Sequence, residues 1–481
     1  MSKKSHKARF SIDVGTIHFI GIGGIGMSGI AEILHNLGYK VQGSDLSPSY
    51  VTDHLTKIGI KVIIGQEGSN INGTSVVVKS SAVKNNNAEI IAAREQNIPI
   101  IKRSEMLAEI MRLKTCIAIA GTHGKTTTTT MVTAVLDSAN LDPTVINGGI
   151  INSYGSNAHL GQGDWLVAEA DESDGTFLKL PATIAVVTNI DPEHLENYKG
   201  SFDVLREAFK DYVENIPFYG FAVLCLDHSE VRDLAKKITD RRIITYGIES
   251  DDAEVKAENI TSSPDGSRYN VRVKGTSRII KDIYLSMPGI HNVLNSLASI
   301  SIAVELGFTD EEIRKSFSNF KGIKRRFTRV GEVNGIMIID DYGHHPKEIM
   351  ATLKTAKQVV PEGQGRVIAV MQPHRYTRVR DLFNDFCTCF ADADIVLVSD
   401  IYKAGEEPIA GIDRDNLIKG IKQSGKKEVY PIESPEELPL LIKDLAKSGD
   451  IIICLGAGDI TKWAANLPLQ LEKAYADKAI G

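Results

Sequence analysis

The chain has 481 residues, more than one hydrophobic core normally supports, and roughly 150 residues per domain predicts about three domains. Its 42% hydrophobic and 24% charged residues are typical of a soluble globular enzyme. The formal net charge of -6 provides no basic field, which argues against nucleic acid as the main partner.

The N-terminus, "MSKKSHKARF", is basic, but no long apolar run with a small-residue cleavage site follows it. "IHFIGIGGIG" is too short and too rich in glycine to span a membrane. We therefore expect a cytoplasmic protein with no membrane contact. The five cysteines form no C-x-x-C pair, and Cys116, Cys225 and Cys454 lie in apolar runs, so we expect reduced core residues.

Apolar strand-like runs alternate with helical patterns along most of the chain, which predicts an α/β protein with parallel sheets covered by helices. We expect three domains: a Rossmann-like domain at 1–112, a P-loop ATPase-type domain with a mixed sheet at 113–324, and a second Rossmann-like domain at 325–481. A helix and linker are expected from Met106 to Lys114. Antiparallel strands are expected within 253–287, where short alternating pieces interrupt the parallel rhythm.

The first segment carries a glycine-rich turn, "IHFIGIGGIGMSGIAEIL". It fits G-x-G-x-x-G at Gly21, Gly23 and Gly26, after a predicted strand and before a predicted helix. Asp45 follows at the end of the next strand, where an acid would meet a ribose hydroxyl. The pattern is weak alone and indicates only a ligand that carries a diphosphate.

A second turn, "IAIAGTHGKTTTTTMV", opens the central segment. It places backbone amides, Lys125 and hydroxyls at a helix N-terminus, where an anion is favoured. Lys125 would reach the terminal phosphates of a nucleotide and Thr126 a magnesium ion. Because Ile119 stands where the full P-loop pattern has its first glycine, only G-x-x-G-K-T remains. Five consecutive threonines are poor helix formers and need a structural reason.

Magnesium requires carboxylates near this turn, and two acidic loops supply them. "WLVAEADESDGTF" carries Glu169, Asp171, Glu172 and Asp174, and "AVVTNIDPEHLENY" carries Asp191, Glu193 and His194. Oxygen ligands suit magnesium, and a histidine can complete a second site. Acidic loops are often only solvated, but both of these follow strands of the sheet that carries the P-loop.

Polar groups also gather near the end of the central segment. "SMPGIHNVLNSLAS" puts His291, Asn292 and Asn295 on the first turns of a helix, where they could meet a purine edge or cap the helix. "KGIKRRFTRV" clusters Arg325, Arg326 and Arg329, cations that could neutralise a phosphoryl-transfer transition state or form a solvated charge run.

Two blocks of the third segment follow predicted strands. "IIDDYGHHPKEI" supplies Asp341, Tyr342, His344 and His345, and "AVMQPHRYTRVRDLF" supplies His374, Arg375, Tyr376 and Arg378. Two guanidinium groups can hold a carboxylate bidentately, so a second substrate with a carboxylate is expected. A further glycine turn closes "DIIICLGAGD".

The ordered motifs resemble those of the Mur ligases of peptidoglycan synthesis. The resemblance extends from about Thr16 to Trp463 and rests on "IHFIGIGGIGMSGIAEIL", "GTHGKTTTT", "EADESD", "NIDPEHLENY", "PGIHNVLN", "RRF", "DDYGHHP" and "QPHRYTR". It implies an ATP-dependent ligase that joins L-alanine to the lactyl carboxylate of UDP-N-acetylmuramate through an acyl phosphate, giving ADP and phosphate. A family member that recycles murein peptides is the alternative, although its first glycine turn reads differently from "GIGGIGMSG".

The resemblance also implies the ligands. ATP would meet Gly121, Thr122, His123, Gly124, Lys125, Thr126, Thr127, His291, Asn292, Asn295 and Asp341, with Arg326 on its phosphates. Two magnesium ions would be bound by Thr126, Glu169 and His194. The UDP substrate would meet Gly23, Gly24, Ile25, Gly26, Met27, Ser28, Asp45, Ser80, Ser81 and Arg103, and alanine Tyr342, His344, Arg375 and Arg378. The catalytic set would be Lys125, Glu169, His194 and Arg326.

Two other classes of protein remain open. A nicotinamide-dependent oxidoreductase could use the first glycine turn, but the P-loop and its acidic partners speak against it. A non-catalytic nucleotide switch would not need the histidine and arginine blocks of the third segment. Some family members use a carbamylated lysine for a second metal, and Lys210 in "AFKDYV" is no confident match. The assembly is expected to be a monomer or homodimer.

Overall fold

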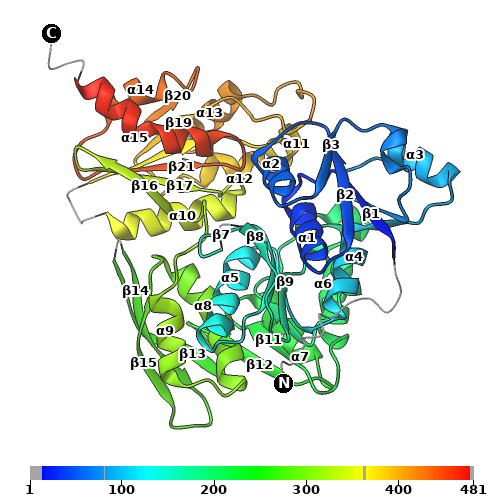
Figure 1. The fold of residues 1–481 in the computed structure, drawn as a ribbon. Helices are drawn as coiled ribbons and strands as arrows, with labels where there is room; N and C mark the ends of the chain where they lie inside the picture. Colours follow the sequence, from blue (N-terminus) through cyan, green and yellow to red (C-terminus); the bar gives the residue numbers. More distant parts are fainter. Residues whose placement is uncertain (1–13, 81, 155, 264, 361–364, 477–481) are drawn as a thin grey trace. The chain divides into compact units, whose positions relative to one another are not determined.

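The computed structural model describes residues 14–80, 82–154, 156–263, 265–360 and 365–476 (Figure 1). Their strands form three sheets, of five, ten and six strands. The chain divides into two compact units: the first holds the five-stranded sheet and most of the ten-stranded sheet, and the second holds the six-stranded sheet with the short pieces 260–268 and 284–293. The α/β class and the three-sheet architecture expected from the sequence are confirmed.

The N-terminal sheet has the order β3-β2-β1-β4-β5, and its neighbouring strands are parallel. The order reverses between β1 and β4, so the first glycine turn leaves β1 at the point where open α/β sheets bind ligands. Its strands are β1 Thr16–Ile20, β2 Lys40–Asp45, β3 Lys61–Ile64, β4 Val76–Lys79 and β5 Ile100–Lys102. Its helices are α1 Ile25–Asn36, α2 Tyr50–Lys57, η1 Gly68–Ile71, α3 Ala88–Glu95 and α4 Arg103–Met111.

The helix expected from Met106 begins earlier, at Arg103, directly after β5. The Glu105 carboxylate accepts a hydrogen bond of 2.8 Å from the backbone amide of Lys102, which satisfies one of the free amides at this helix start. The pattern alone missed this because the first turn carries Arg103 and Ser104, whereas the apolar stripe starts at Met106.

The central sheet runs in the order β15-β14-β13-β12-β11-β10-β6-β9-β7-β8. Its strands are β6 Thr115–Ala120, β7 Thr144–Ile151, β8 Ser156–His159, β9 Trp165–Glu169, β10 Ile184–Val187, β11 Phe221–Cys225, β12 Ile243–Gly247, β13 Val255–Ser263, β14 Gly266–Val273 and β15 Ile279–Leu285. The helices are α5 Lys125–Ser138, η2 Glu172–Asp174, η3 Thr176–Lys179, η4 Leu195–Tyr198, α6 Phe202–Glu214, α7 Ser229–Lys237, α8 Ile290–Glu305 and α9 Asp310–Ser318.

The middle of this sheet is parallel. Strand β6 lies between β10 and β9, so the P-loop leaves the sheet where the chain order reverses. Strands β10 and β11 are buried throughout, as expected of apolar runs covered on both faces. The expected antiparallel section is confirmed by β14 and β15, neighbours joined by the five-residue connection 274–278, because a connection this short cannot join parallel strands. Strand β8, antiparallel to β7, was not predicted.

The C-terminal sheet has the order β16-β17-β21-β18-β19-β20. Its strands are β16 Thr328–Val333, β17 Ile336–Asp341, β18 Val367–Met371, β19 Ile395–Val398, β20 Val429–Pro431 and β21 Ile451–Leu455. Its helices are α10 Pro346–Val359, α11 Tyr376–Asp381, α12 Phe383–Thr388, α13 Arg414–Gln423, α14 Leu438–Leu445 and α15 Ile460–Ala476. Strand β16 is antiparallel to β17, so this sheet is mixed rather than purely parallel.

Two cores cover the two faces of the C-terminal sheet. Alternate residues of β21 divide between them: Ile453 joins a core with α10, α12 and α13, and Ile452 joins a core with α14 and α15. All five cysteines are buried free thiols, as predicted. Across the described ranges, none of the helices has the length and apolar character that a membrane crossing would need.

Candidate active site

The P-loop turn joins β6 to α5 through two glycines with positive φ. Gly121 has φ 131° and Gly124, the N-cap of α5, has φ 83°, values that residues with a Cβ rarely adopt. The turn is held from the loop after β10 by Asn189. Its Oδ1 accepts 2.7 Å from the amide of His123 and its Nδ2 donates 2.9 Å to the carbonyl of His123. Asn189 lies inside a recognised motif, but its role as the clamp of the turn was not predicted.

Lys125 begins α5 and lies folded back over the turn. Its Nζ donates to the carbonyls of Gly121 (2.6 Å) and Thr122 (3.1 Å) and to both carboxylate oxygens of Glu172 (3.0 and 2.9 Å). The two side chains are only 16% and 3% exposed. Burial alone would lower the pKa of Lys125, but the nearby Glu172 and Asp171 raise it above its ordinary value. The ammonium is therefore charged and paired with Glu172.

The threonine run is explained by burial. Thr126 is half-buried on the first turn of α5, whereas Thr127, Thr128, Thr129 and Thr130 are buried. Thr130 Oγ1 donates 2.9 Å to the carbonyl of Thr126 and accepts 2.9 Å from Asn147 Nδ2. Thr130 is thus satisfied both inside the helix and by the neighbouring strand β7, whereas the buried hydroxyls of Thr128 and Thr129 have no hydrogen-bond partner among the described residues.

The first acidic loop follows β9 and joins the two glycine turns. Glu169 Oε1 accepts 2.8 Å from the amide of Gly148, and a Cβ at Gly148 would lie 2.7 Å from Glu169 Oε2. Asp171 pairs with Arg103 of α4 at 3.1 Å. Burial would raise the pKa of Asp171, but Lys125 and Arg103 hold it below its ordinary value. Asp171 is thus close to two cations, Lys125 of the P-loop and Arg103, which lies beside the first glycine turn.

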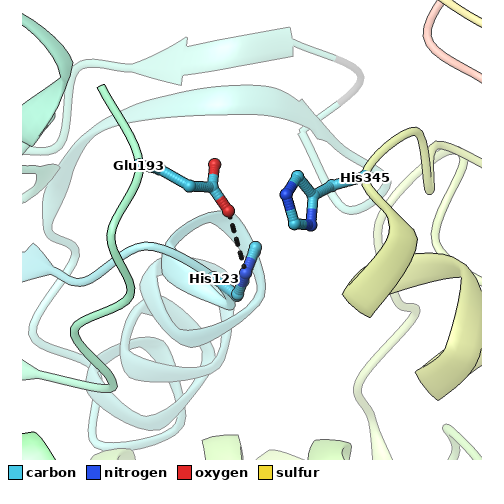
Figure 2. A group of neighbouring side chains, drawn as sticks. All are labelled: His123, Glu193 and His345. Atoms are coloured by element: carbon cyan, nitrogen blue, oxygen red, sulfur yellow. Dashed lines mark ion pairs between the residues drawn. The ribbon is translucent and has the colours of Figure 1, made fainter. Parts of the chain in front are cut away.

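The second acidic loop follows β10 and contacts the P-loop. His123 Nε2 lies 3.2 Å from Glu193 Oε1 and 3.5 Å from Asp191 Oδ2, and Figure 2 shows the imidazole of His123 facing the Glu193 carboxylate. Figure 2 also draws His345, which belongs to the other compact unit. His194 has φ 55°, is 38% exposed and lies 3.8 Å from Glu196.

The first glycine turn is surrounded by the residues predicted to share its ligand. Asp45 Oδ2 accepts 2.8 Å from the amide of Gly23, and Ser80 lies beside Gly21. A Cβ at Gly26 would be 2.3 Å from Arg103 Nη1, so the glycine leaves room for this guanidinium. Gly24 is the N-cap of α1, and Met27 and Ser28 are buried in its first turn. Ser81 and the side chains of Ile25 and Asp174 lie outside the described part of the chain.

Helix α8 carries the three polar residues expected near a purine. Asn295 belongs to the first unit, and a Cβ at Gly124 would lie 2.7 Å from its Oδ1, so this amide lies against the P-loop. Asn292 is buried and its Nδ2 donates 2.7 Å to the carbonyl of Pro288. Burial, with a smaller contribution from Arg326, lowers the pKa of His291 to about 4, so its imidazole is neutral at pH 7.

In the second unit, Asp341 ends β17 and is buried. Its Oδ2 accepts 2.8 Å from the amide of Phe327, and its Oδ1 accepts from the amide of Gly343 (2.8 Å) and from Thr352 Oγ1 (3.1 Å). A carboxylate has about four acceptor sites, so one remains for a further donor. Burial raises the pKa of Asp341 despite the charge of Arg326.

An aromatic and cationic group follows β17 and β18. The guanidinium groups of Arg325 and Arg326 lie 4.8 and 5.4 Å from the ring centre of Tyr342. The His344 ring meets Tyr342 edge-on at 5.2 Å and lies 6.0 Å from His374. His374 links these rings to the arginines, because Arg378 Nη1 donates 3.3 Å to His374 Nδ1 and Arg375 follows His374 in the chain. The four residues predicted to bind the amino acid, Tyr342, His344, Arg375 and Arg378, therefore lie near one another. The sequence alone identifies His374 only as a member of this block.

These features define a three-sheet α/β protein with a P-loop and a second phosphate-type glycine turn. Three family models cover the chain in order: the Mur ligase family catalytic domain at 16–115, the Mur ligase middle domain at 119–303, and the Mur ligase glutamate ligase domain at 325–458. The chain belongs to the Mur ligase family.

Relatives with similar sequence and structure refine this result. The UDP-N-acetylmuramate–L-alanine ligase of Bradyrhizobium diazoefficiens is 57% identical over 96% of this chain and 99% of its own. That of Rhodospirillum centenum is 57% identical over 96% of both chains. The crystal structure of the Thermotoga maritima UDP-N-acetylmuramate–alanine ligase matches with a TM-score of 0.80 and 31% identity, covering 96% of this chain and all of that one. A murein peptide ligase of Psychrobacter arcticus matches with a TM-score of 0.68 and 25% identity, covering 95% of this chain and 98% of that one.

Proposed function

We propose that this protein joins L-alanine to the lactyl carboxylate of UDP-N-acetylmuramate at the expense of ATP, a cytoplasmic step of peptidoglycan precursor synthesis. The observation that carries the proposal is its 57% identity to an alanine-adding ligase over 96% of the chain. The murein peptide ligase is less similar in sequence and in fold, which argues against the recycling activity. The ligase chemistry also accounts for two phosphate turns, which an oxidoreductase would not need.

The reaction follows from the poor electrophilicity of a carboxylate. The lactyl carboxylate attacks the γ-phosphorus of ATP, ADP leaves, and an acyl phosphate forms. The amine of alanine then attacks the acyl carbon, the C–O bond to phosphate breaks, and inorganic phosphate departs as the amide forms. Positioning of the reactants and neutralisation of phosphate charge supply most of such catalysis.

The P-loop would bind the triphosphate of ATP. Amides at the start of α5 and the ammonium of Lys125 would meet the β- and γ-phosphates, and Lys125 must exchange its bonds to Glu172 for bonds to phosphate. Asn295 lies against the turn and supports an ATP contact from α8. In the second unit, His291 and Asn292 would meet adenine, Arg326 a phosphate, and the remaining acceptor site of Asp341 a ribose hydroxyl.

The residues near the P-loop fit a magnesium ion. Thr126 offers a hydroxyl on the first turn of α5, and Glu169 ends β9, in register with Ile119 of β6. The absence of a side chain at Gly148 leaves room for the Glu169 carboxylate, which supports a role as a positioned oxygen ligand. Magnesium bound there would neutralise charge on the phosphates. His194, half exposed after β10, would serve a second ion.

The first glycine turn would bind the diphosphate of UDP-N-acetylmuramate. Residues 23–28 at the start of α1 would line the diphosphate together with the guanidinium of Arg103, whereas Asp45, Ser80 and Ser81 suit the uridine. Alanine would be held in the second unit, with its carboxylate on Arg375 and Arg378 and with Tyr342 and His344 beside it. A monomer or homodimer is sufficient for these roles.

The decisive experiment measures phosphate release by purified protein with ATP and Mg²⁺, omitting one substrate at a time. We expect release only when UDP-N-acetylmuramate and L-alanine are both present. Release that required a murein tripeptide instead of alanine would assign the recycling activity. No release under any combination would refute the ligase proposal.

A further inference from the structure

The loop that follows β19 braces the segment that carries the two arginines of the amino-acid site. The amide of Arg375 donates 2.9 Å to the carbonyl of Tyr402, and the amide of Tyr402 donates 2.8 Å to the carbonyl of Pro373. His374 and Tyr402 thus form a parallel β-bridge outside the regular strands. Residues that lie almost thirty positions apart in the sequence are thereby fixed to each other by their main chains.

Side chains reinforce this bridge. The rings of His374 and Tyr402 are stacked, with centroids 5.5 Å apart and planes inclined by 10°. His374 in turn contacts His344 and accepts a hydrogen bond from Arg378. Tyr402 therefore lies behind His374, while Arg378 and His344 contact the same imidazole.

A carboxylate from the same loop holds the start of α11. Glu406 Oε2 accepts 3.0 Å from the amide of Thr377, and its Oε1 accepts 2.7 Å from the Thr377 hydroxyl. The carboxylate satisfies a free amide at the beginning of a helix of six residues that contains Arg378. Arg375 is thus flanked by a bridge to Tyr402 on one side and by this cap on the other.

Arg375 itself has a backbone conformation that needs such support. Its φ is 71° and its ψ 131°, a combination that L-residues other than glycine rarely adopt. An arginine released from the bridge and the cap would relax toward negative φ, which would redirect its side chain. The strain is located at a residue predicted to bind the substrate carboxylate.

We infer that Tyr402 and Glu406 are positioning residues for the amino-acid substrate, because they hold Arg375 and Arg378 in the arrangement that receives its carboxylate. This inference rests on the proposed function, which places the alanine carboxylate on these two arginines. Both residues would act through Arg375 and Arg378. Losing either support would lower the fraction of molecules with a competent site, and the affinity for alanine would fall in proportion.

The test compares initial rates of phosphate release with L-alanine, ATP and UDP-N-acetylmuramate varied in turn. We expect Tyr402→Leu and Glu406→Ala to raise KM for L-alanine about tenfold, as follows if one molecule in ten keeps the competent conformation. Because both arginines would contact the carboxylate in the ground and transition states alike, kcat and the other two KM values should stay within about twofold.

Two matched variants complete the design. Tyr402→Phe keeps the stacked ring and should restore the wild-type KM for L-alanine to within about twofold. Lys403→Ala removes an exposed neighbour in the same loop and should behave like wild type. Glu406→Ala carries the same expectation as Tyr402→Leu, so the inference remains testable if the leucine variant does not fold.

An unchanged KM for L-alanine in both disruptive variants would overturn the inference. A fall in kcat together with a rise in all three KM values would overturn it as well, because that pattern indicates general damage to the unit. Wild-type protein that released no alanine-dependent phosphate would instead refute the proposed function and the inference with it.

Discussion

The pairing of Lys125 with Glu172 leads to a prediction that joins catalysis to stability. Lys125→Met keeps most of the side-chain stem but removes the ammonium from a carboxylate that is 3% exposed. Phosphate release should be abolished, because the proposed contact of Lys125 with the β- and γ-phosphates of ATP would be lost. The variant should also be less stable, because Glu172 then lies buried without its cation.

The size of the destabilisation is limited by protonation. A buried carboxylate without a partner takes up a proton, and its burial already raises the pKa of Glu172 above the ordinary 4.5. Protonation costs about 1.4 kcal/mol per pH unit above the unfolded-state value, so the penalty reaches about 3 kcal/mol at pH 7 and about 1.4 kcal/mol at pH 5.5. The variant should therefore recover stability relative to wild type as the pH falls toward 4.5.

Fluorescence can isolate this effect. The chain has two tryptophans, and Trp165 begins β9, paired with Thr115 of β6, so a Trp463→Phe background reports unfolding around the P-loop. Urea unfolding at pH 7 and 5.5 gives the two free-energy differences. The double variant Lys125→Met/Glu172→Gln should regain most of the stability but none of the activity. Equal stability of Lys125→Met and wild type at pH 7 would refute the reasoning, as would a penalty that did not shrink at the lower pH.

Three further predictions concern other parts of the site. Glu169→Gln keeps an acceptor for the Gly148 amide but removes the charge, so the Mg²⁺ concentration for half-maximal activity should rise; an unchanged Mg²⁺ titration would contradict the assignment. Arg103→Ala should raise KM for UDP-N-acetylmuramate at least tenfold, which is equivalent to about 1.4 kcal/mol of binding free energy. The KM for ATP should rise much less, and initial rates with each substrate varied in turn would measure both values. Burial lowers the pKa of His344 to about 4, below 6.5 in the unfolded chain. The contribution of neutral His344 to the free energy of unfolding is therefore complete above pH 6.5 and is lost as the pH falls toward 4. The loss should reach about 2 kcal/mol at pH 5. In His344→Gln the urea midpoint of the second unit, measured through Trp463 in a Trp165→Phe background, should therefore change less between pH 7 and 5 than in wild type. The same pH dependence in both proteins would count against this prediction.

The parallel strands were predictable because long apolar runs with glycine turns leave few alternatives. The strands that escaped prediction are antiparallel additions at sheet edges. Strand β8 reads "SNAH", with little apolar character, and β16 contains Gly331, where its register with β17 shifts. Such edges are stabilised by a partner strand rather than by their own pattern, so one sequence gives no local signal for them.

Site residues divide in a similar way. The glycines, Lys125 and the acidic loops were recognisable because each follows a strand at a fixed spacing. The ion pair of Arg103 with Asp171 and the clamp by Asn189 join residues more than sixty positions apart, and only the folded chain brings them together. Their signal in the sequence was membership of a motif, without any indication of the partner.

The third glycine turn, "GAGD" after β21, is filled by a side chain of the protein itself. Gln372 Oε1 accepts 3.2 Å from the amide of Ile460, the first residue of α15, and Gln372 Nε2 donates 2.6 Å to Asp459. A Cβ at Gly458 would lie 2.3 Å from the same Gln372 oxygen. A protein side chain thus occupies the place where a phosphate would lie in the other two turns.

The link between the first glycine turn and the P-loop has a consequence for inhibition. Arg103 and Lys125 share one short acidic segment, Asp171 and Glu172. A compound that draws Arg103 toward the first turn removes a positive charge from Asp171 and makes that segment more attractive to Lys125. We therefore expect inhibitors directed at the two turns to interfere with each other in combination, so that their joint dose–response departs from independent action.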